Sequence, residues 1–103
     1  MMLHFLPHYV KDILSGKKRA TVRLGRKGVK KGMVIYLSAG GRPFARARVV
    51  RVKYGKLKEL GPQEIKAEGY SSFSELLREL RKIYPVISPE DEVTYIEWRI
   101  EEK

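Results

Sequence analysis

The spacing of apolar residues changes from helical to strand-like at Arg19, and this change limits the chain to folds that mix helices and strands. Between Pro7 and Gly16, apolar side chains recur every three or four residues, which predicts a short helix that ends at the glycine. From Arg19 to Leu24, apolar and polar side chains alternate. The segment therefore predicts a half-buried strand whose polar face carries Arg19, Thr21 and Arg23.

The rest of the chain predicts four further strands and two further helices. The predicted strands cover residues 2–6, 33–37, 43–54 and 93–100. Alternation slips near Val49 and Val50, which predicts a bulge. A short helix follows Pro62, and a second begins at a capping box formed by Ser72 and Glu75. The apolar stripe of that helix, which Pro85 should end, is Phe73, Leu76, Leu77, Leu80 and Ile83.

The order and number of these elements predict one domain over residues 1–103. Mostly antiparallel strands with few helices place it in the α+β class. A small mixed β-barrel of about five to six strands with two or three short helices fits this pattern.

Positive charge is concentrated in the first half of the chain. Residues 1–58 carry 16 basic side chains and one acid, whereas residues 59–103 carry 6 basic side chains and 11 acids, and the net charge is +10. A basic half predicts attraction to phosphates, and so to RNA or a nucleotide-like ligand. A solvated surface on a heat-adapted protein also explains it, because the chain has no Asn, one Gln and many charged residues.

Several classes of protein are excluded by what the sequence lacks. The chain contains no cysteine, which excludes disulfides, thiolate metal sites and cysteine nucleophiles. No apolar run approaches the roughly 20 residues needed to cross a bilayer, and no basic leader precedes a long apolar segment at the start. His4 and His8 are too few to predict a metal site. We therefore expect a cytoplasmic domain without membrane contact, metal or cofactor, with a monomer favoured and the oligomeric state left open.

The segment from Lys18 to Arg23 concentrates the polar groups that carry chemistry. A threonine hydroxyl at Thr21 lies between cationic neighbours, which favour negative charge on an oxygen. A lysine held in a dry pocket can accept a hydroxyl proton. The simpler alternative is an edge strand that is charged only for solubility.

Here the sequence resembles a known family. The pattern Gly-x-Lys-x-x-Thr-x-Arg is formed by Gly16, Lys18, Thr21 and Arg23. A glycine-bounded loop then ends in Lys31-Gly32-Met33-Val34-Ile35, and Glu68-Gly69-Tyr70, Ile83-Tyr84-Pro85 and a last strand with Trp98 follow. Over essentially its full length this combination resembles the ASCH domain, a branch of the PUA-like barrels.

The resemblance implies a PUA-like barrel with helices at its mouth and a cleft lined by the motif, which binds RNA or a nucleotide. Small single-domain members are amidohydrolases that remove the acetyl group from N4-acetylcytidine, with a Thr nucleophile, a Lys proton acceptor and a Glu proton donor. Lys18 and Thr21 match two of these positions directly. Ungapped counting from Tyr84-Pro85 places Gly69 at the acid's position, and a shift of one residue brings in Glu68.

Further residues are candidates for ligand binding. Gly16 and Arg23 belong to the motif, and Tyr70 is a candidate for stacking on a base. Six further basic residues have two interpretations: they contact phosphates, or they only form a solvated face. These residues are Arg26, Lys27, Lys30, Lys31, Arg46 and Arg48. Glu68 has a second interpretation, in which it only balances the charge of Lys18 or Arg23. The first hypothesis is thus an RNA-binding or modified-nucleoside-binding domain, and the alternative is an N4-acetylcytidine amidohydrolase. A third is a small protein that docks on an acidic partner.

Overall fold

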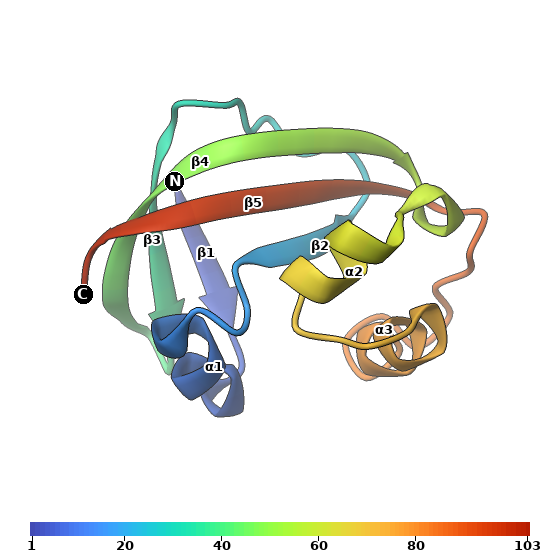
Figure 1. Ribbon diagram of the computed structural model, residues 1–103, viewed down its shortest axis with the longest axis horizontal. Coiled ribbons are helices and arrows are strands. Elements are labelled where there is room, and N and C mark those ends of the chain that lie inside the picture. The colour runs from blue at the N-terminus through green and yellow to red at the C-terminus, as the bar shows by residue number, and fades with distance from the viewer.

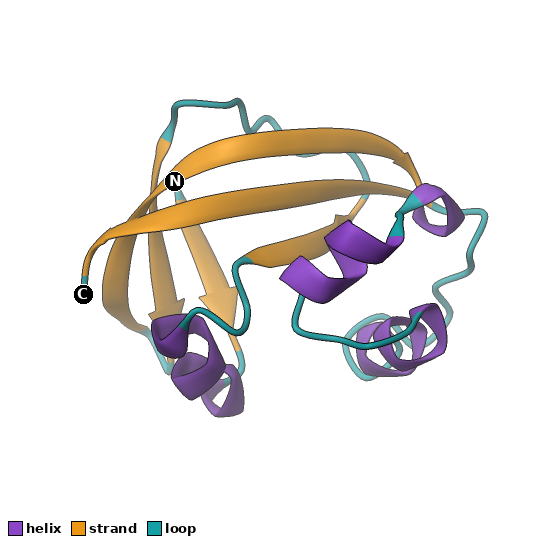
Figure 2. Ribbon diagram, in the orientation of Figure 1, coloured by secondary structure: helices purple, strands orange, loops and turns teal.

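The fold is one curled five-stranded sheet with three short helices (Figures 1 and 2). It is described by a computed structural model that covers residues 1–103. The strands are β1 (Met2–Phe5), β2 (Ala20–Leu24), β3 (Val34–Ala39), β4 (Arg42–Lys56) and β5 (Glu92–Glu102). The helices are α1 (Val10–Ser15), α2 (Pro62–Ala67) and α3 (Phe73–Leu80), with single 3-10 turns at Pro7–Tyr9 and Leu57–Glu59. None of the helices has the length and apolarity needed to cross a membrane.

The sheet has the order β1-β3-β4-β5-β2, and only the β1–β3 pair is parallel. The long strands β4 and β5 bend strongly, so the sheet curls into a half-barrel (Figure 1). The β4–β5 register shifts between Val49 and Arg51, which confirms the bulge predicted near Val49 and Val50. The α+β class and the small PUA-like barrel are confirmed.

Two apolar clusters fill the fold, one on each side of β5. Ile96 and Trp98 pack into the first cluster with α1, β1 and β3, and Trp98 is 3% exposed. Val93 and Tyr95 point the other way, into the second cluster with α2 and α3. Alternation along β5 therefore serves both cores, because both faces of this strand are covered.

The alternation predicted for β2 is present, with two differences. Ala20 and Val22 lie in the second core, but Leu24 is exposed because the strand ends there. On the polar face Thr21 is buried, whereas Arg19 before the strand is exposed. The polar face of β2 is therefore a wall of a cavity and not a solvated surface.

Helix α3 ends earlier than predicted. Ser72 accepts a hydrogen bond from the Glu75 backbone N–H at 3.1 Å, as expected of an N-cap, but the Glu75 carboxylate accepts from Ser71. The helix ends at Leu80 because the Ile83 N–H bonds to the Leu80 carbonyl, which tightens the last turn. Ile83 is exposed and does not extend the apolar stripe.

The buried carboxylate of Glu64 in α2 forms ion pairs with two cations of β4. Its oxygens lie 2.6 Å from Arg51 Nη2 and 3.2 Å from Lys53 Nζ, and the Gly61 N–H donates to Oε1 at 2.7 Å. Burial acts to raise the pKa of Glu64, but the Gly61 N–H and the two cations outweigh it and hold the pKa below its usual range. The stability from this carboxylate is therefore full above the pKa of the unfolded chain and is lost as pH falls through the lower folded value.

Glu64→Gln is expected to lower the free energy of unfolding at pH 7 by about 1–3 kcal/mol, because charge-assisted hydrogen bonds are lost. The difference from wild type should shrink as pH falls below about 4 and through the lowered folded pKa of Glu64, where the wild-type carboxylate becomes protonated. Urea unfolding of wild type and variant at pH 7 and at a pH below about 4 measures this difference in the free energy of unfolding. The control is Glu92→Gln, an exposed residue of β5 that has no ion pair and should change stability by less than about 0.5 kcal/mol. Equal losses in the two variants would contradict the role of Glu64.

Candidate functional site

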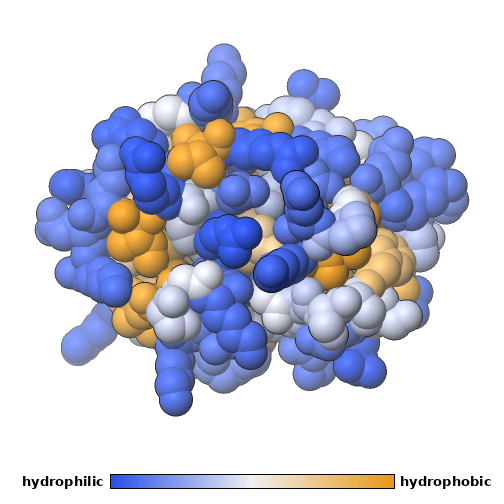
Figure 3. Space-filling view, in the orientation of Figure 1, coloured by the Kyte–Doolittle hydropathy of each residue, from blue (hydrophilic) through white to orange (hydrophobic).

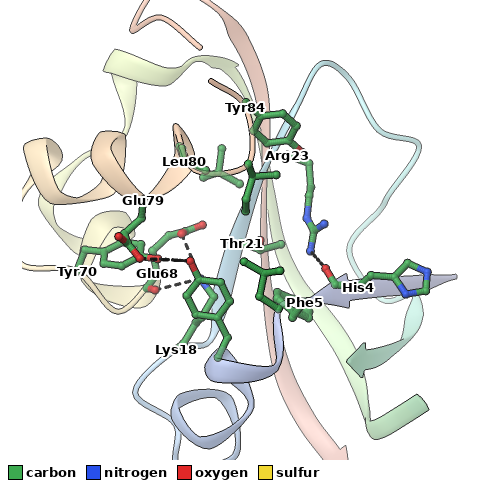
Figure 4. A pocket seen from close by; sticks show the side chains of 14 residues that line it. His4, Phe5, Lys18, Thr21, Arg23, Glu68, Tyr70, Glu79, Leu80 and Tyr84 are labelled. Atoms are coloured by element: carbon green, nitrogen blue, oxygen red, sulfur yellow. Dashed lines mark hydrogen bonds and ion pairs between the residues drawn. The ribbon is translucent and has the colours of Figure 1, made fainter. Parts of the chain in front are cut away.

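A cavity of about 230 Å³ lies between the two edge strands of the curled sheet, β1 and β2, and the end of α3 (Figure 4). Strand β1 provides His4 and Phe5, and β2 provides Thr21, Val22 and Arg23. The other lining residues are Leu6, Tyr9, Lys18, Glu68, Tyr70, Glu79, Leu80, Ile83 and Tyr84. Segments far apart in the sequence therefore meet in one hollow, which includes Lys18, Thr21, Arg23, Glu68 and Tyr70 among the predicted site residues.

Lys18 is placed in the cavity by the end of α1. Gly16 adopts a left-handed conformation with φ 86°, and the Lys18 N–H then bonds to the Asp12 carbonyl at 3.0 Å. The Lys18 side chain is buried, and its ammonium donates to the Glu68 backbone carbonyl at 3.2 Å and to Glu68 Oε2 at 3.3 Å. The rings of Tyr9 and Tyr70 lie 5.2 and 5.4 Å from Nζ. This ammonium is thus held by one residue and flanked by two aromatic faces.

Glu68 ends α2 and is 2% exposed. Its Oε2 pairs with Lys18, while its Oε1 is enclosed and has no hydrogen-bond partner. Burial raises the pKa of this carboxyl, and the charges of Lys18 and Arg23 offset part of the effect. Gly69 follows with φ +97° and lies close to the backbone of Lys17 and Lys18. The carboxylate that contacts Lys18 therefore belongs to Glu68. Ungapped counting from Tyr84-Pro85 places Gly69 at this position, one residue later in the chain.

Thr21 faces the cavity from the centre of β2. It pairs with Ile96 of β5, and its neighbours Ala20 and Val22 point into the second core. The residue is 6% exposed, and its hydroxyl makes no hydrogen bond within the chain while it lines the hollow. A free hydroxyl in a mostly buried position is available to a bound molecule.

Arg23 bridges the two edges of the sheet. Its Nη2 donates to the His4 carbonyl at 2.9 Å, and its guanidinium lies 4.9 Å from the centre of the Phe5 ring. Arg23 forms no ion pair with Glu68, so of the two partners considered for that carboxylate only Lys18 binds it. Burial lowers the pKa of Arg23, and its Nε is enclosed without a partner. The guanidinium thus keeps one N–H without a partner in the chain.

Sequence reasoning missed Tyr9 and Glu79. Tyr70 donates to the Tyr9 hydroxyl at 3.5 Å, and Tyr9 donates to Glu79 Oε1 at 3.4 Å. Glu79 also pairs with Lys82. Burial raises the pKa of both tyrosines, so both keep their protons. The available signal was the position of Glu79 on the polar side of α3, but only the packing of α3 on the sheet places it near Tyr9.

The other predicted binding residues lie outside this cavity. Gly16 lines a separate hollow that Tyr70 also lines. In the loop between β2 and β3, the Arg26 guanidinium lies 4.2 Å from the centre of the Tyr54 ring, and Lys27, Lys30 and Lys31 are exposed. On β4, ion pairs with acids of β5 hold the two remaining arginines: Arg46 with Glu102, and Arg48 with Glu101.

A family model described as the ASCH domain matches residues 4–102, which is nearly the whole chain. The chain belongs to the ASCH domain family. Among solved structures, the hypothetical protein PH0355 resembles this ASCH domain with a TM-score of 0.75 at 23% identity, over 97% of each chain. The ASCH protein of Zymomonas mobilis has a TM-score of 0.71 at 17% identity, over 95% of this chain and 65% of that one.

A third structure, the ASCH domain of Lactobacillus crispatus JV V101, has a TM-score of 0.66 at 16% identity, over 87% of this chain and 68% of that one. Identities this low show a shared fold. No curated protein matches this ASCH domain.

The cavity of this ASCH domain combines groups that can act together on a polar ligand. It holds a free hydroxyl on Thr21, a buried ion pair between Lys18 and Glu68, and a guanidinium on Arg23. Two enclosed polar atoms, Glu68 Oε1 and Arg23 Nε, have no partner in the chain. An unpartnered buried polar group costs about 1–3 kcal/mol, so a ligand that supplies one donor and one acceptor would be stabilised here.

Proposed function

We propose that this ASCH domain binds one modified nucleoside, free or carried in RNA, in the cavity around Lys18, Thr21, Arg23 and Glu68. The observation that carries the proposal is the meeting of these four side chains in one hollow of about 230 Å³. Cavities for drug-sized ligands begin at about 300 Å³, so this volume suits a single base with part of its sugar. The wall supplies aromatic faces from Tyr9, Tyr70 and Tyr84, on which a base can stack.

The unpartnered polar atoms favour a cytosine whose exocyclic nitrogen is acylated. Such a base carries an N–H donor at N4 and carbonyl acceptors on the ring and on the acyl group. Glu68 Oε1 lacks a donor and Arg23 Nε lacks an acceptor, and such a base carries both kinds of group. An unmodified uracil-type base has no N4 donor for the carboxylate and should bind less tightly.

A second candidate function, hydrolysis of the acyl amide, is favoured by the pairing of Lys18 with Glu68. Hydrolysis needs a base for the Thr21 hydroxyl and an acid for the departing nitrogen. The pair supplies both when one proton moves from Lys18 Nζ to Glu68 Oε2 across the 3.3 Å hydrogen bond. This transfer leaves the total charge of the pair unchanged, and burial lowers its cost because a buried site disfavours charged groups.

The proposed reaction is balanced over two stages. Thr21 Oγ1 attacks the acyl carbon while its proton passes to Lys18, and Glu68 then protonates N4 as the C–N bond breaks. Cytidine leaves, the acyl group remains as an ester on Thr21, and the pair is ionic. Water then attacks the ester and gives a proton to Glu68, and Lys18 returns its proton to the Thr21 oxygen. One water is consumed, and one cytidine and one carboxylic acid are released.

Incubation of the wild-type chain with N4-acetylcytidine is expected to release cytidine and acetate in equal amounts, measured by chromatography. Calorimetric titration with N4-methylcytidine, which has no acyl carbon to attack, should show binding without product. Binding of both nucleosides with no product would overturn hydrolysis and leave the binding function. No binding of either nucleoside would overturn both functions.

A further inference from the structure

A second and larger hollow, of about 990 Å³, lies beside the nucleoside cavity between the end of α1 and the start of α3. The chain from α1 to β2 contributes Lys17 and Arg19 to it, and α2 contributes Lys66. Phe73 and Tyr70 give it aromatic surface. Figure 3 shows that hydrophilic side chains cover much of the face that carries α1 and α2. This hollow is named the basic groove below, with Lys17, Arg19 and Lys66 as its cations.

The three cations of the basic groove are free of protein partners. Lys17, Arg19 and Lys66 are exposed and take part in no ion pair or side-chain hydrogen bond, unlike Arg46 and Arg48 on β4. The one acid that lines the groove, Glu75, accepts a hydrogen bond from Ser71. Three cations against one carboxylate leave the groove with a net positive charge, which favours a polyanion.

The groove and the nucleoside cavity share a wall. Tyr70 lines both, and the backbone of Lys17 and Lys18 packs against Gly69 between them. Lys17 lines the groove while the next residue, Lys18, points into the cavity. A nucleotide whose base occupies the cavity would therefore have its neighbouring phosphates near the groove.

We propose that the basic groove binds the phosphate backbone of a single-stranded RNA whose modified base occupies the nucleoside cavity. The inference rests on the proposed function, and it assigns the substrate as a nucleotide within a strand. A single strand is favoured because its base can enter a cavity without the cost of unpairing and unstacking that a base in a duplex carries. Cations that follow the backbone beside aromatic side chains are the usual means of binding single strands.

Reversal of the three groove charges tests the proposal. Lys17→Glu/Arg19→Glu/Lys66→Glu is compared with Lys30→Glu/Lys31→Glu/Arg42→Glu, which changes the net charge equally. Those three control residues are exposed, unpaired, and lie outside both hollows. The probe is a fluorescent RNA of about nine nucleotides with one central N4-acetylcytidine, a length within the range covered by small single-strand binding domains. All proteins also carry Thr21→Ala so that the acyl group survives.

The groove variant is expected to bind the RNA at least about tenfold more weakly than the control variant. Three phosphate contacts predict a slope of log K against log salt of about −2 for a single strand, which is roughly a 20-fold loss between 50 and 200 mM salt. The slope should approach zero in the groove variant and persist in the control. Both variants should bind free N4-acetylcytidine equally, because it has no phosphate.

Equal RNA affinities in the two variants would overturn the proposal, and so would a loss confined to the control variant, which would assign the strand to the loop between β2 and β3. Failure of free N4-acetylcytidine to bind any of the proteins would overturn the nucleoside cavity instead. In that case a groove-dependent loss of RNA binding would still assign the backbone to the groove.

Discussion

Thr21→Ala should reduce turnover of N4-acetylcytidine by at least about 10³-fold, because it removes the attacking oxygen and leaves only binding and proton transfer. Stability should be nearly unchanged, since the Thr21 hydroxyl makes no hydrogen bond within the chain and its backbone pairing with Ile96 remains. Thr21→Ser keeps an oxygen in place and should retain measurable turnover. Initial rates of cytidine release, together with the midpoint of thermal unfolding, test both statements.

The matched control for Thr21→Ala is Ser74→Ala, which removes an exposed hydroxyl from α3. It should turn over substrate at the wild-type rate. If Thr21→Ala stays folded and still releases cytidine at a comparable rate, threonine is not the nucleophile. The Lys18–Glu68 pair would then have to activate water directly.

Lys18→Met is expected to lower the free energy of unfolding at pH 7 by about 3–5 kcal/mol, since it leaves the buried Glu68 carboxylate without its cation. Burial already raises the pKa of Glu68, and loss of Lys18 removes the main effect that opposes it. A carboxyl whose pKa is higher in the folded state than in the unfolded state contributes its full stability at pH values below the unfolded-state pKa. That contribution is lost as pH rises through the folded-state pKa. The deficit of Lys18→Met should therefore shrink as pH falls from 7 towards 4.

The double variant Lys18→Met/Glu68→Gln should recover much of that loss, because no buried charge remains. Urea unfolding of both single variants and the double variant gives the coupling energy of the pair. A loss below about 1 kcal/mol in Lys18→Met, with no recovery in the double variant, would contradict a dry, mutually dependent pair. Turnover should be absent in both variants, so stability and not activity decides this test.

The parts of the fold that local spacing controls could be predicted from the sequence. Helix α1, the strand from Ala20 and the bulge near Val49 follow from the periodicity of neighbouring side chains. The end of α3 could not be predicted, because it depends on a tightened turn at Leu80 five residues before Pro85. The burial of Thr21 likewise depends on how far the sheet curls, which no local pattern records.

The candidate site was predictable where the motif is local and not where partners come from distant segments. Lys18, Thr21 and Arg23 are close in sequence, and β2 holds the last two on one face. The pairing of Glu68 with Lys18 crosses 50 positions, and the sequence left open whether Lys18 or Arg23 is the partner. The pairing of Arg48 with Glu101 crosses 53 positions and was not predicted. The second pairing depends on the β4–β5 register, so neither interpretation of Arg48, phosphate contact or solvated face, took its partner into account.

The contact between Arg23 and the His4 carbonyl has a consequence for the range of acyl groups that the proposed nucleoside site would accept. The seam between β1 and β2 is joined by a side chain and not by a ladder of backbone hydrogen bonds. We expect rotation of this guanidinium to release the contact between β1 and β2 while every strand pair stays intact. A fully closed β-barrel would have to break backbone strand pairing to admit a bulkier acyl chain. In this domain, loss of the one hydrogen bond from Arg23 to the His4 carbonyl would be enough.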